Sequence, residues 1–332
     1  MKKFLLFLLS LFIGLVLFIW IGKSVGWQEI KGAILSFSGQ QGIIILALTI
    51  IIALLGNWKW KEILKSGGVK ISFKSLLSPF LAGYAVMFLA PILLWGGEIF
   101  RSYVLKQRNM VPWPKGMASV VIDRILEWTA NLLVIFIGTI LFFLKIGLPP
   151  IKLMVVFGIA LFILTAGIIF FYFKSIKKES MVRFFIGGNK NTPFGVEKEI
   201  FNFFKIKKIE MWKVFGITLL RTAVMYLRAW VLIIFLGKKI GFVTAVAILG
   251  FTYLAVLIPI PTSLGSHEVI QIFAFDSLGL GVSTATAFTM IIRGAELIIA
   301  LTGVVILFRL GLILLKNIFF KKVNGIAKNN TV

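Results

Sequence analysis

Long apolar stretches separated by short basic loops dominate the sequence. Four stretches carry no charged residue and reach the length of about 20 residues that a membrane-spanning helix needs; they are 4–21, 76–97, 153–173 and 240–266. No period-two alternation, which would predict a β-barrel, accompanies them. Because lipid offers no hydrogen-bond partner to the backbone, these stretches are predicted to be helices. The predicted fold class is an all-α polytopic membrane protein forming a single integral membrane domain over 1–332.

The composition of the chain excludes several classes of function. The chain is 59% hydrophobic, carries a net charge of +24 and contains no cysteine, so disulfides and thiolate chemistry are excluded. The lysines and arginines are spread over loops between apolar stretches, where they mark the cytoplasmic face and meet anionic headgroups. We therefore expect membrane lipids as partners, and no nucleic acid, metal or cofactor.

Nine apolar segments can be drawn, and they cannot all cross the membrane. They are 4–22, 42–57, 76–96, 118–144, 151–173, 212–236, 240–260, 266–281 and 284–315. With nine crossings and a cytoplasmic N-terminus, the strongly basic loop 174–211 would lie outside, against the positive-inside rule. Starting from the opposite side places the lysines of 58–75, Lys59 among them, on the wrong face instead.

Two helical hairpins that return to their own side resolve this conflict. Proline removes a backbone donor and glycine permits tight turns, so both stretches 76–108 and 240–281 can break inside the membrane. The expected breaks are Pro91, Gly96 and Gly97 in the first stretch and Pro259, Pro261 and Gly265 in the second. Six crossings remain, both termini become cytoplasmic, and 25 basic residues lie inside against 6 outside.

This topology divides the chain into two halves, 4–173 and 212–316, joined by the basic loop 174–211. Within and after that loop, 196–215 is basic and aromatic with helical spacing, which predicts an amphipathic helix on the cytoplasmic leaflet. A plain solvated connector is the alternative.

Charged side chains inside the apolar segments are the candidate site. An unpaired charge at the bilayer centre costs roughly 2.5–3.5 kcal/mol, so such residues need partners. Helical spacing predicts the pairs Glu98–Arg101, Arg124–Glu127 and Arg293–Glu296. The predicted substrate-binding residues are Glu98, Arg101, Asp123, Arg124, Glu127, Arg221, Arg228, His267, Glu268, Arg293 and Glu296.

The charges recur in two matched units. Each unit has a Pro/Gly break, a glutamate that opens the next arm, and a later Arg-x-x-Glu pair. Glu98 precedes Arg124 by 26 residues, and Glu268 precedes Arg293 by 25. Since the two hairpins would enter from opposite faces, the units predict an inverted repeat, an architecture of secondary transporters.

This constellation suits an anionic headgroup. Helix N-termini at hairpin tips present free N–H groups, and arginine offers forked donors to phosphate. The acidic partners would keep the arginines paired in the empty site. His267 is interpreted as a hairpin-turn hydrogen bonder rather than a pH-sensitive group. The alternative is that the charges only lock helices together.

The same residues resemble a known family, the lysylphosphatidylglycerol synthase transmembrane region, or flippase-like domain. The first pattern is Pro91 followed by Gly97-Glu98-x-x-Arg101 and Ser119-x-x-x-Asp123-Arg124; the second runs from Pro259 through Pro261 and Gly265 to Glu268. The resemblance spans nearly the whole chain. His267 departs from it, because family members often carry arginine there.

The resemblance implies translocation of an anionic, aminoacylated or polyprenyl-phosphate lipid across the cell membrane by alternating access. It also implies a separate lipid synthase or glycosyltransferase as a partner, because the chain ends soon after its last helix and carries no synthase domain. We therefore expect no enzyme. The alternative is a membrane enzyme, or an accessory subunit, that acts on a lipid phosphate; no Asp-x-Asp pair, histidine cluster or activated nucleophile supports it.

Overall fold

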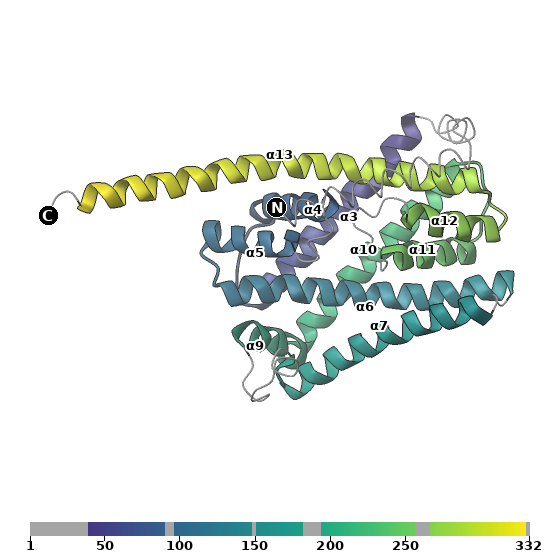
Figure 1. Cartoon of the computed structure of the whole chain (residues 1–332), viewed down its shortest axis with the longest axis horizontal. Coiled ribbons are helices and arrows are strands. Elements are labelled where there is room, and N and C mark those ends of the chain that lie inside the picture. The colour runs from purple at the N-terminus through teal and green to yellow at the C-terminus, as the bar shows by residue number, and fades with distance from the viewer. Residues whose placement is uncertain (1–38, 90–95, 148–150, 182–193, 257–265, 330–332) are drawn as a thin grey trace.

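The computed structural model describes residues 39–89, 96–147, 151–181, 194–256 and 266–329, and the regular secondary structure in these ranges is all helical (Figure 1). Its helices are α3 (Gly39–Ser66), α4 (Phe73–Leu89), α5 (Gly96–Asn109), α6 (Trp113–Ile146), α7 (Ile151–Lys177), α9 (Gly195–Phe201), α10 (Lys208–Phe235), α11 (Phe242–Val256), α12 (Ser266–Ser277) and α13 (Val282–Asn329), with a π-helical turn at Asn202–Ile206. The predicted all-α class is confirmed.

Four of the described helices are long and apolar enough to cross a membrane: α3, α6, α10 and the Val282–Arg309 part of α13. They contain the predicted crossings 42–57 and 118–144 and most of 212–236 and 284–315. The predicted crossing 151–173 lies within α7, and 4–22 lies outside the described residues.

Each predicted hairpin is a pair of short helices. The stretch 76–108 forms α4 and α5, and 240–281 forms α11 and α12. At 1.5 Å per residue, the 14 residues of α5 and the 12 of α12 rise about 21 and 18 Å, less than the roughly 30 Å of a bilayer core. Gly96 and Gly97 open α5, while Pro91, Pro259, Pro261 and Gly265 lie outside the described residues.

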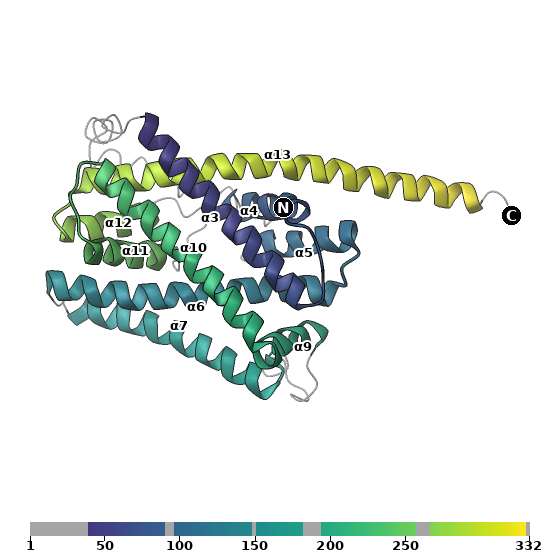
Figure 2. The same ribbon diagram turned by 180° about the vertical axis from the view of Figure 1, so that it is seen from behind.

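The two hairpins lie between the two longest helices. In Figure 1, α4 and α5 occupy one end of the space between α6 and α13, and α11 and α12 occupy the other. Helix α4 packs on α13, and α11 packs on α6, so each hairpin leans on the long helix of the other half. Helices α3 and α10 pack side by side and run diagonally across this layer (Figure 2).

The helix boundaries reveal a repeat of constant length. Three pairs of helices begin 169 residues apart: α3 at Gly39 and α10 at Lys208, α4 at Phe73 and α11 at Phe242, α6 at Trp113 and α13 at Val282. The starts of α5 and α12 differ by 170. In both views α6 and α13 run in opposite directions, as do α3 and α10, so the repeat is inverted (Figures 1 and 2).

Close backbone approaches hold the halves together. A Cβ atom on Gly250 of α11 would lie 2.9 Å from the Cα of Gly138 on α6 and 3.2 Å from the carbonyl oxygen of Val134. On the other side, a Cβ atom on Gly303 of α13 would lie 2.2 Å from the carbonyl oxygen of Leu81 on α4. Small residues at such crossings allow the tight packing that drives helix association in lipid.

The basic stretch 196–215 is not one helix, contrary to the sequence prediction. It divides into α9, the π-helical turn and the first residues of α10, with a break at Lys207, whose φ is −94° and ψ is 52°. Phe203 and Phe204 of the turn are buried, and Phe204 packs edge-on against Phe171 of α7. These two phenylalanines, which the sequence pattern predicted to face lipid, are therefore buried against other helices of the protein.

Candidate functional site

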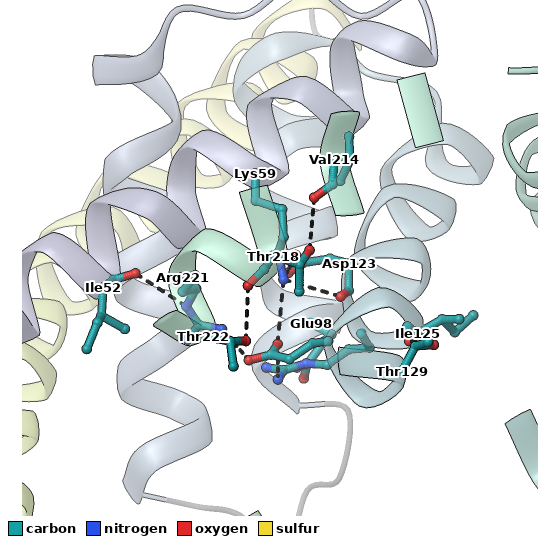
Figure 3. Close-up of polar contacts among 12 residues, drawn as sticks. Ile52, Lys59, Glu98, Asp123, Ile125, Thr129, Val214, Thr218, Arg221 and Thr222 are labelled. Carbon is teal, nitrogen blue, oxygen red and sulfur yellow. Dashed lines mark hydrogen bonds and ion pairs between the residues drawn. The ribbon is translucent and has the colours of Figure 1, made fainter. Parts of the chain in front are cut away.

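Seven charged residues from four helices meet inside the protein, and we call them the charge cluster. They are Lys59 of α3, Glu98 and Arg101 of α5, Asp123, Arg124 and Glu127 of α6, and Arg221 of α10. Figure 3 shows Lys59, Asp123, Glu98 and Arg221 converging from different helices. Six of the seven were predicted as site residues; the structure adds Lys59.

Asp123 joins two cations. Its Oδ1 lies 2.8 Å from the Nζ of Lys59, and its Oδ2 accepts a hydrogen bond of 3.2 Å from Nη1 of Arg101. All three residues are at most 4% exposed. Taking three charges this far from water is costly, and their mutual pairing offsets part of that cost.

Glu127 joins three cations. Its carboxylate pairs with Arg221, lies 3.1 Å from Nη1 of Arg124, and lies 3.8 Å from the Nζ of Lys59. Arg124 also donates from Nε to Glu98. Helix α10 is tied to α3 as well, since Arg221 donates to the carbonyl oxygen of Ile52 at 3.3 Å.

A second, smaller group lies in the other half. Arg228 of α10 is 4% exposed; its Nη2 lies 3.0 Å from Oε1 of Glu296 on α13, and its Nη1 donates to Thr49 of α3 at 3.1 Å. The guanidinium carbon of Arg293 lies 5.8 Å from the ring centroid of Phe88 on α4. Arg221 and Arg228 of α10 therefore belong to different charged groups, pairing with Glu127 of α6 and Glu296 of α13 respectively.

Arg101 is held between aromatic rings. Its guanidinium carbon lies 4.0 Å from the ring centroid of Trp60 and 4.9 Å from that of Phe80. Trp60 is itself fully buried and donates from Nε1 to Ser119 of α6 at 3.0 Å. This cage compensates part of the desolvation of Arg101 and fixes its orientation.

A small pocket of about 40 Å³ borders the cluster. Its charged walls include Lys59, Glu98, Arg101 and Arg221, and α4 closes it with Phe80, Gly83, Tyr84 and Met87. Nε and Nη2 of Arg101 and Oε2 of Glu98 are buried and have no hydrogen-bond partner among the described residues. Since unmet buried polar groups are expensive, these atoms are open positions for a ligand or for water.

The charge balance of the cluster favours an anion. It contains four cations and three carboxylates, so one positive charge is uncompensated within it when all seven are ionised. In surroundings of low dielectric constant an unbalanced charge is destabilising unless a counter-charge arrives. An anionic group with two acceptor oxygens would supply that charge and meet the open donors of Arg101.

Some predicted pairings were wrong. Glu98 and Arg101 do not pair along α5; Glu98 binds Arg124 and Arg101 binds Asp123, both on α6. The carboxylate of Glu296 pairs with Arg228 of α10, and the predicted pair between Glu296 and Arg293 stays a prediction. Arg124–Glu127 is confirmed at 3.1 Å. The side chains of His267 and Glu268 lie outside the described part of the chain.

Lys59 was predicted to lie in a cytoplasmic loop but is buried at 1% exposure. The apolar run ends near Asn57, yet the sequence contains no glycine or proline until Gly67-Gly68, and α3 continues to Ser66. The absence of a helix-breaking residue after Asn57 is the signal that would have placed Lys59 on the helix. Its partner Asp123 could not be identified from local spacing.

These features define a polytopic helical membrane protein with two inverted halves and a charged pocket that is lined by helices of the first half and by Arg221 of α10. The chain matches the family model described as the lysylphosphatidylglycerol synthase TM region over residues 7–303, and it belongs to that family. A similar protein is UPF0104 membrane protein MJ1595 of Methanocaldococcus jannaschii, which is 25% identical over 285 residues, 81% of this chain and 84% of that relative.

Proposed function

We propose that this protein moves a lipid with an anionic headgroup, such as an aminoacyl-phospholipid or a polyprenyl-phosphate intermediate, between the leaflets of the cytoplasmic membrane. It acts as a flippase-like carrier by alternating access and not as an enzyme. The open, buried donor edge of Arg101, inside a cluster with surplus positive charge, is the observation that carries the proposal.

The fold supports movement of the headgroup through the protein. Helices too short to cross a bilayer lie between two long ones, and each hairpin packs on the opposite half. In inverted-repeat transporters, rocking of one half against the other exposes the site to alternate sides. The cluster involves α3, α5, α6 and α10, so a change in the angle between the halves would alter its pairings.

The distribution of basic residues over the loops supports a cytoplasmic location of both termini and of the enzyme that would supply the lipid. Both termini are proposed to face the cytoplasm, because that orientation gathers most lysines and arginines on the cytoplasmic side. A separate synthase or glycosyltransferase that makes the lipid on that side would deliver it to the charged pocket.

Leaflet exchange in proteoliposomes tests the proposal. The full chain is reconstituted with a panel of fluorescent lipids that share acyl chains and differ in headgroup, and dithionite quenching reports which lipids reach the outer leaflet. Faster exchange of phosphate-bearing anionic lipids than of diacylglycerol supports the proposal. Headgroup turnover without exchange, or no acceleration over protein-free vesicles for any lipid, contradicts it.

A further inference from the structure

The two halves carry equivalent charges at equivalent positions. The 169-residue repeat relates Lys59 to Arg228, Arg124 to Arg293 and Glu127 to Glu296. In each half the cation of the first helix approaches the glutamate of the fourth, with N–O distances of 3.8 Å for Lys59–Glu127 and 3.0 Å for Arg228–Glu296.

The halves differ at both members of the buried ion pair between Arg101 and Asp123. Asp123 of α6 corresponds to Ile292 of α13. Arg101, three residues after Glu98, corresponds to Gln271, three residues after Glu268. The buried ion pair of the first half is thus replaced by neutral residues in the second, although Arg101 and Gln271 are equally buried, at 4% and 1% exposure.

A third difference lies on the facing helices. Gly83 of α4 corresponds to Thr252 of α11. A Cβ atom on Gly83 would lie 2.5 Å from Cγ of Arg101, so glycine makes room for the arginine stem. In the second half, Nε2 of Gln271 donates to the hydroxyl of Thr252.

These differences leave opposite chemistry in the two halves. In the second half, Nε2 of Gln271 is used by Thr252, and what remains open is an acceptor, because Oε1 of Gln271 has no hydrogen-bond partner among the described residues. The first half leaves two donors of Arg101 open beside the pocket, together with one carboxylate oxygen of Glu98. A ligand that offers an anionic oxygen to Arg101 and an O–H donor to Glu98 satisfies both groups.

We propose that the halves have diverged at this ion pair, and that the headgroup binds in the first half, against Arg101 and off the pseudo-twofold axis. The ligand class is a phosphate ester with a neighbouring hydroxyl. The inference rests on the proposed function only for the lipid that carries this group; the location of the site is independent of transport.

The repeat supplies the test variant. In Arg101→Gln/Asp123→Ile the first half receives the residues of the second half, and the double change removes one cation and one anion, so the charge balance of the cluster is kept. The control Glu62→Gln/Lys213→Gln also removes one charge of each sign, from an ion pair of 2.7 Å outside the cluster.

Binding is read from the melting temperature of the purified full chain in detergent, because a ligand that binds only the native state raises it. The probes are phosphatidylglycerol, diacylglycerol and soluble glycerol phosphate. We expect phosphatidylglycerol to stabilise the wild type and the control, and its affinity to fall about tenfold or more in the double variant. Diacylglycerol should have no effect, and a response to glycerol phosphate that depends on Arg101 would show that the free headgroup suffices.

Equal affinity in the double variant, or no response of the wild type to phosphatidylglycerol, overturns the inference. If the double variant does not fold, Arg101→Lys, which keeps the charge and loses the forked donors, must lower the affinity instead. Leaflet exchange separates the two proposals. If lipid exchange persists in the double variant, the proposed site is overturned and the proposed transport function stands. If binding depends on Arg101 but no exchange occurs, the site stands and the transport function is overturned.

Discussion

Lys59 of α3 and Asp123 of α6 form an ion pair of 2.8 Å between Nζ and Oδ1, although 64 residues separate them in the sequence. The pair is almost completely buried, and Arg101 contacts the same carboxylate from a third helix. Asp123 is therefore the anion on which two buried cations depend.

Removing the carboxylate of Asp123 should strongly destabilise the folded protein. We expect Asp123→Ala to lower the free energy of unfolding by about 3–5 kcal/mol, because it leaves two buried cations without their shared partner. Denaturation in mixed micelles, followed by circular dichroism, measures this. Asp276→Asn, at an exposed position of α12, is the control and should stay within about 0.5 kcal/mol of the wild type. Equal stability of the two variants would show that the pair contributes little.

A large side chain at the crossing of α6 and α11 should destabilise the protein. Gly250→Leu places a side chain where a Cβ atom already lies 2.9 Å from the Cα of Gly138, so we expect a loss of about 1–3 kcal/mol or more. Gly158→Leu on α7, where no atom lies within 4 Å of the added Cβ, is the matched control. Thermal unfolding in detergent compares them, and a stable Gly250→Leu would mean that these helices are not in contact.

The packing of each hairpin on the opposite half can be tested by crosslinking. A Cβ atom on Gly303 of α13 would lie 2.8 Å from the Cβ of Ala85 on α4 and 2.2 Å from the carbonyl oxygen of Leu81, so a cysteine at 303 requires the two helices to move apart, toward the Cβ–Cβ separation of about 3.8 Å that a disulfide has. Because the chain has no cysteine, Ala85→Cys/Gly303→Cys should form one crosslink on mild oxidation, detectable by mass spectrometry. The pair Ala85→Cys/Gly158→Cys should not. Failure of the first pair, or efficient crosslinking of the second, contradicts the arrangement.

Glu127 should be needed for lipid movement, because it joins three cations of the cluster. We expect Glu127→Gln to slow leaflet exchange about tenfold or more, since charged hydrogen bonds contribute about 1.5–3 kcal/mol each. Glu210→Gln, exposed in the first turn of α10, should exchange lipid at the wild-type rate. Exchange by Glu127→Gln at that same rate would remove Glu127 from the pathway.

Local patterns predicted much of the fold. Uncharged runs predicted the membrane helices, because lipid forces the backbone to pair with itself. Proline and glycine located the hairpins, since α4 ends and α5 begins around 90–95, and α11 and α12 flank 257–265. The recurring glutamate and Arg-x-x-Glu spacings pointed to the repeat. Each of these signals is a pattern that can be read along the chain without knowing which helices pack together.

The sequence did not predict which charged residues pair between different helices. Spacing along α5 predicted Glu98–Arg101, but α6 lies against α5 and offers Arg124 and Asp123 to these two residues. Lys59 was assigned to a loop because its apolar run ends first, and its burial follows from the packing of α3 against α6 and α10. Helical spacing reports which residues share a face, and it does not report what that face meets.

By itself, therefore, the sequence determined a helical membrane protein with broken hairpins, a repeated charge motif and membership of a recognisable family. The tertiary structure decided which opposite charges meet, that Lys59 joins them, and that Arg101 keeps open donors beside a pocket, whereas the amide nitrogen of Gln271 donates to Thr252. The physical reason is that hydrophobicity and backbone chemistry act locally along the chain. Ion pairs form between whichever side chains the crossing helices bring together.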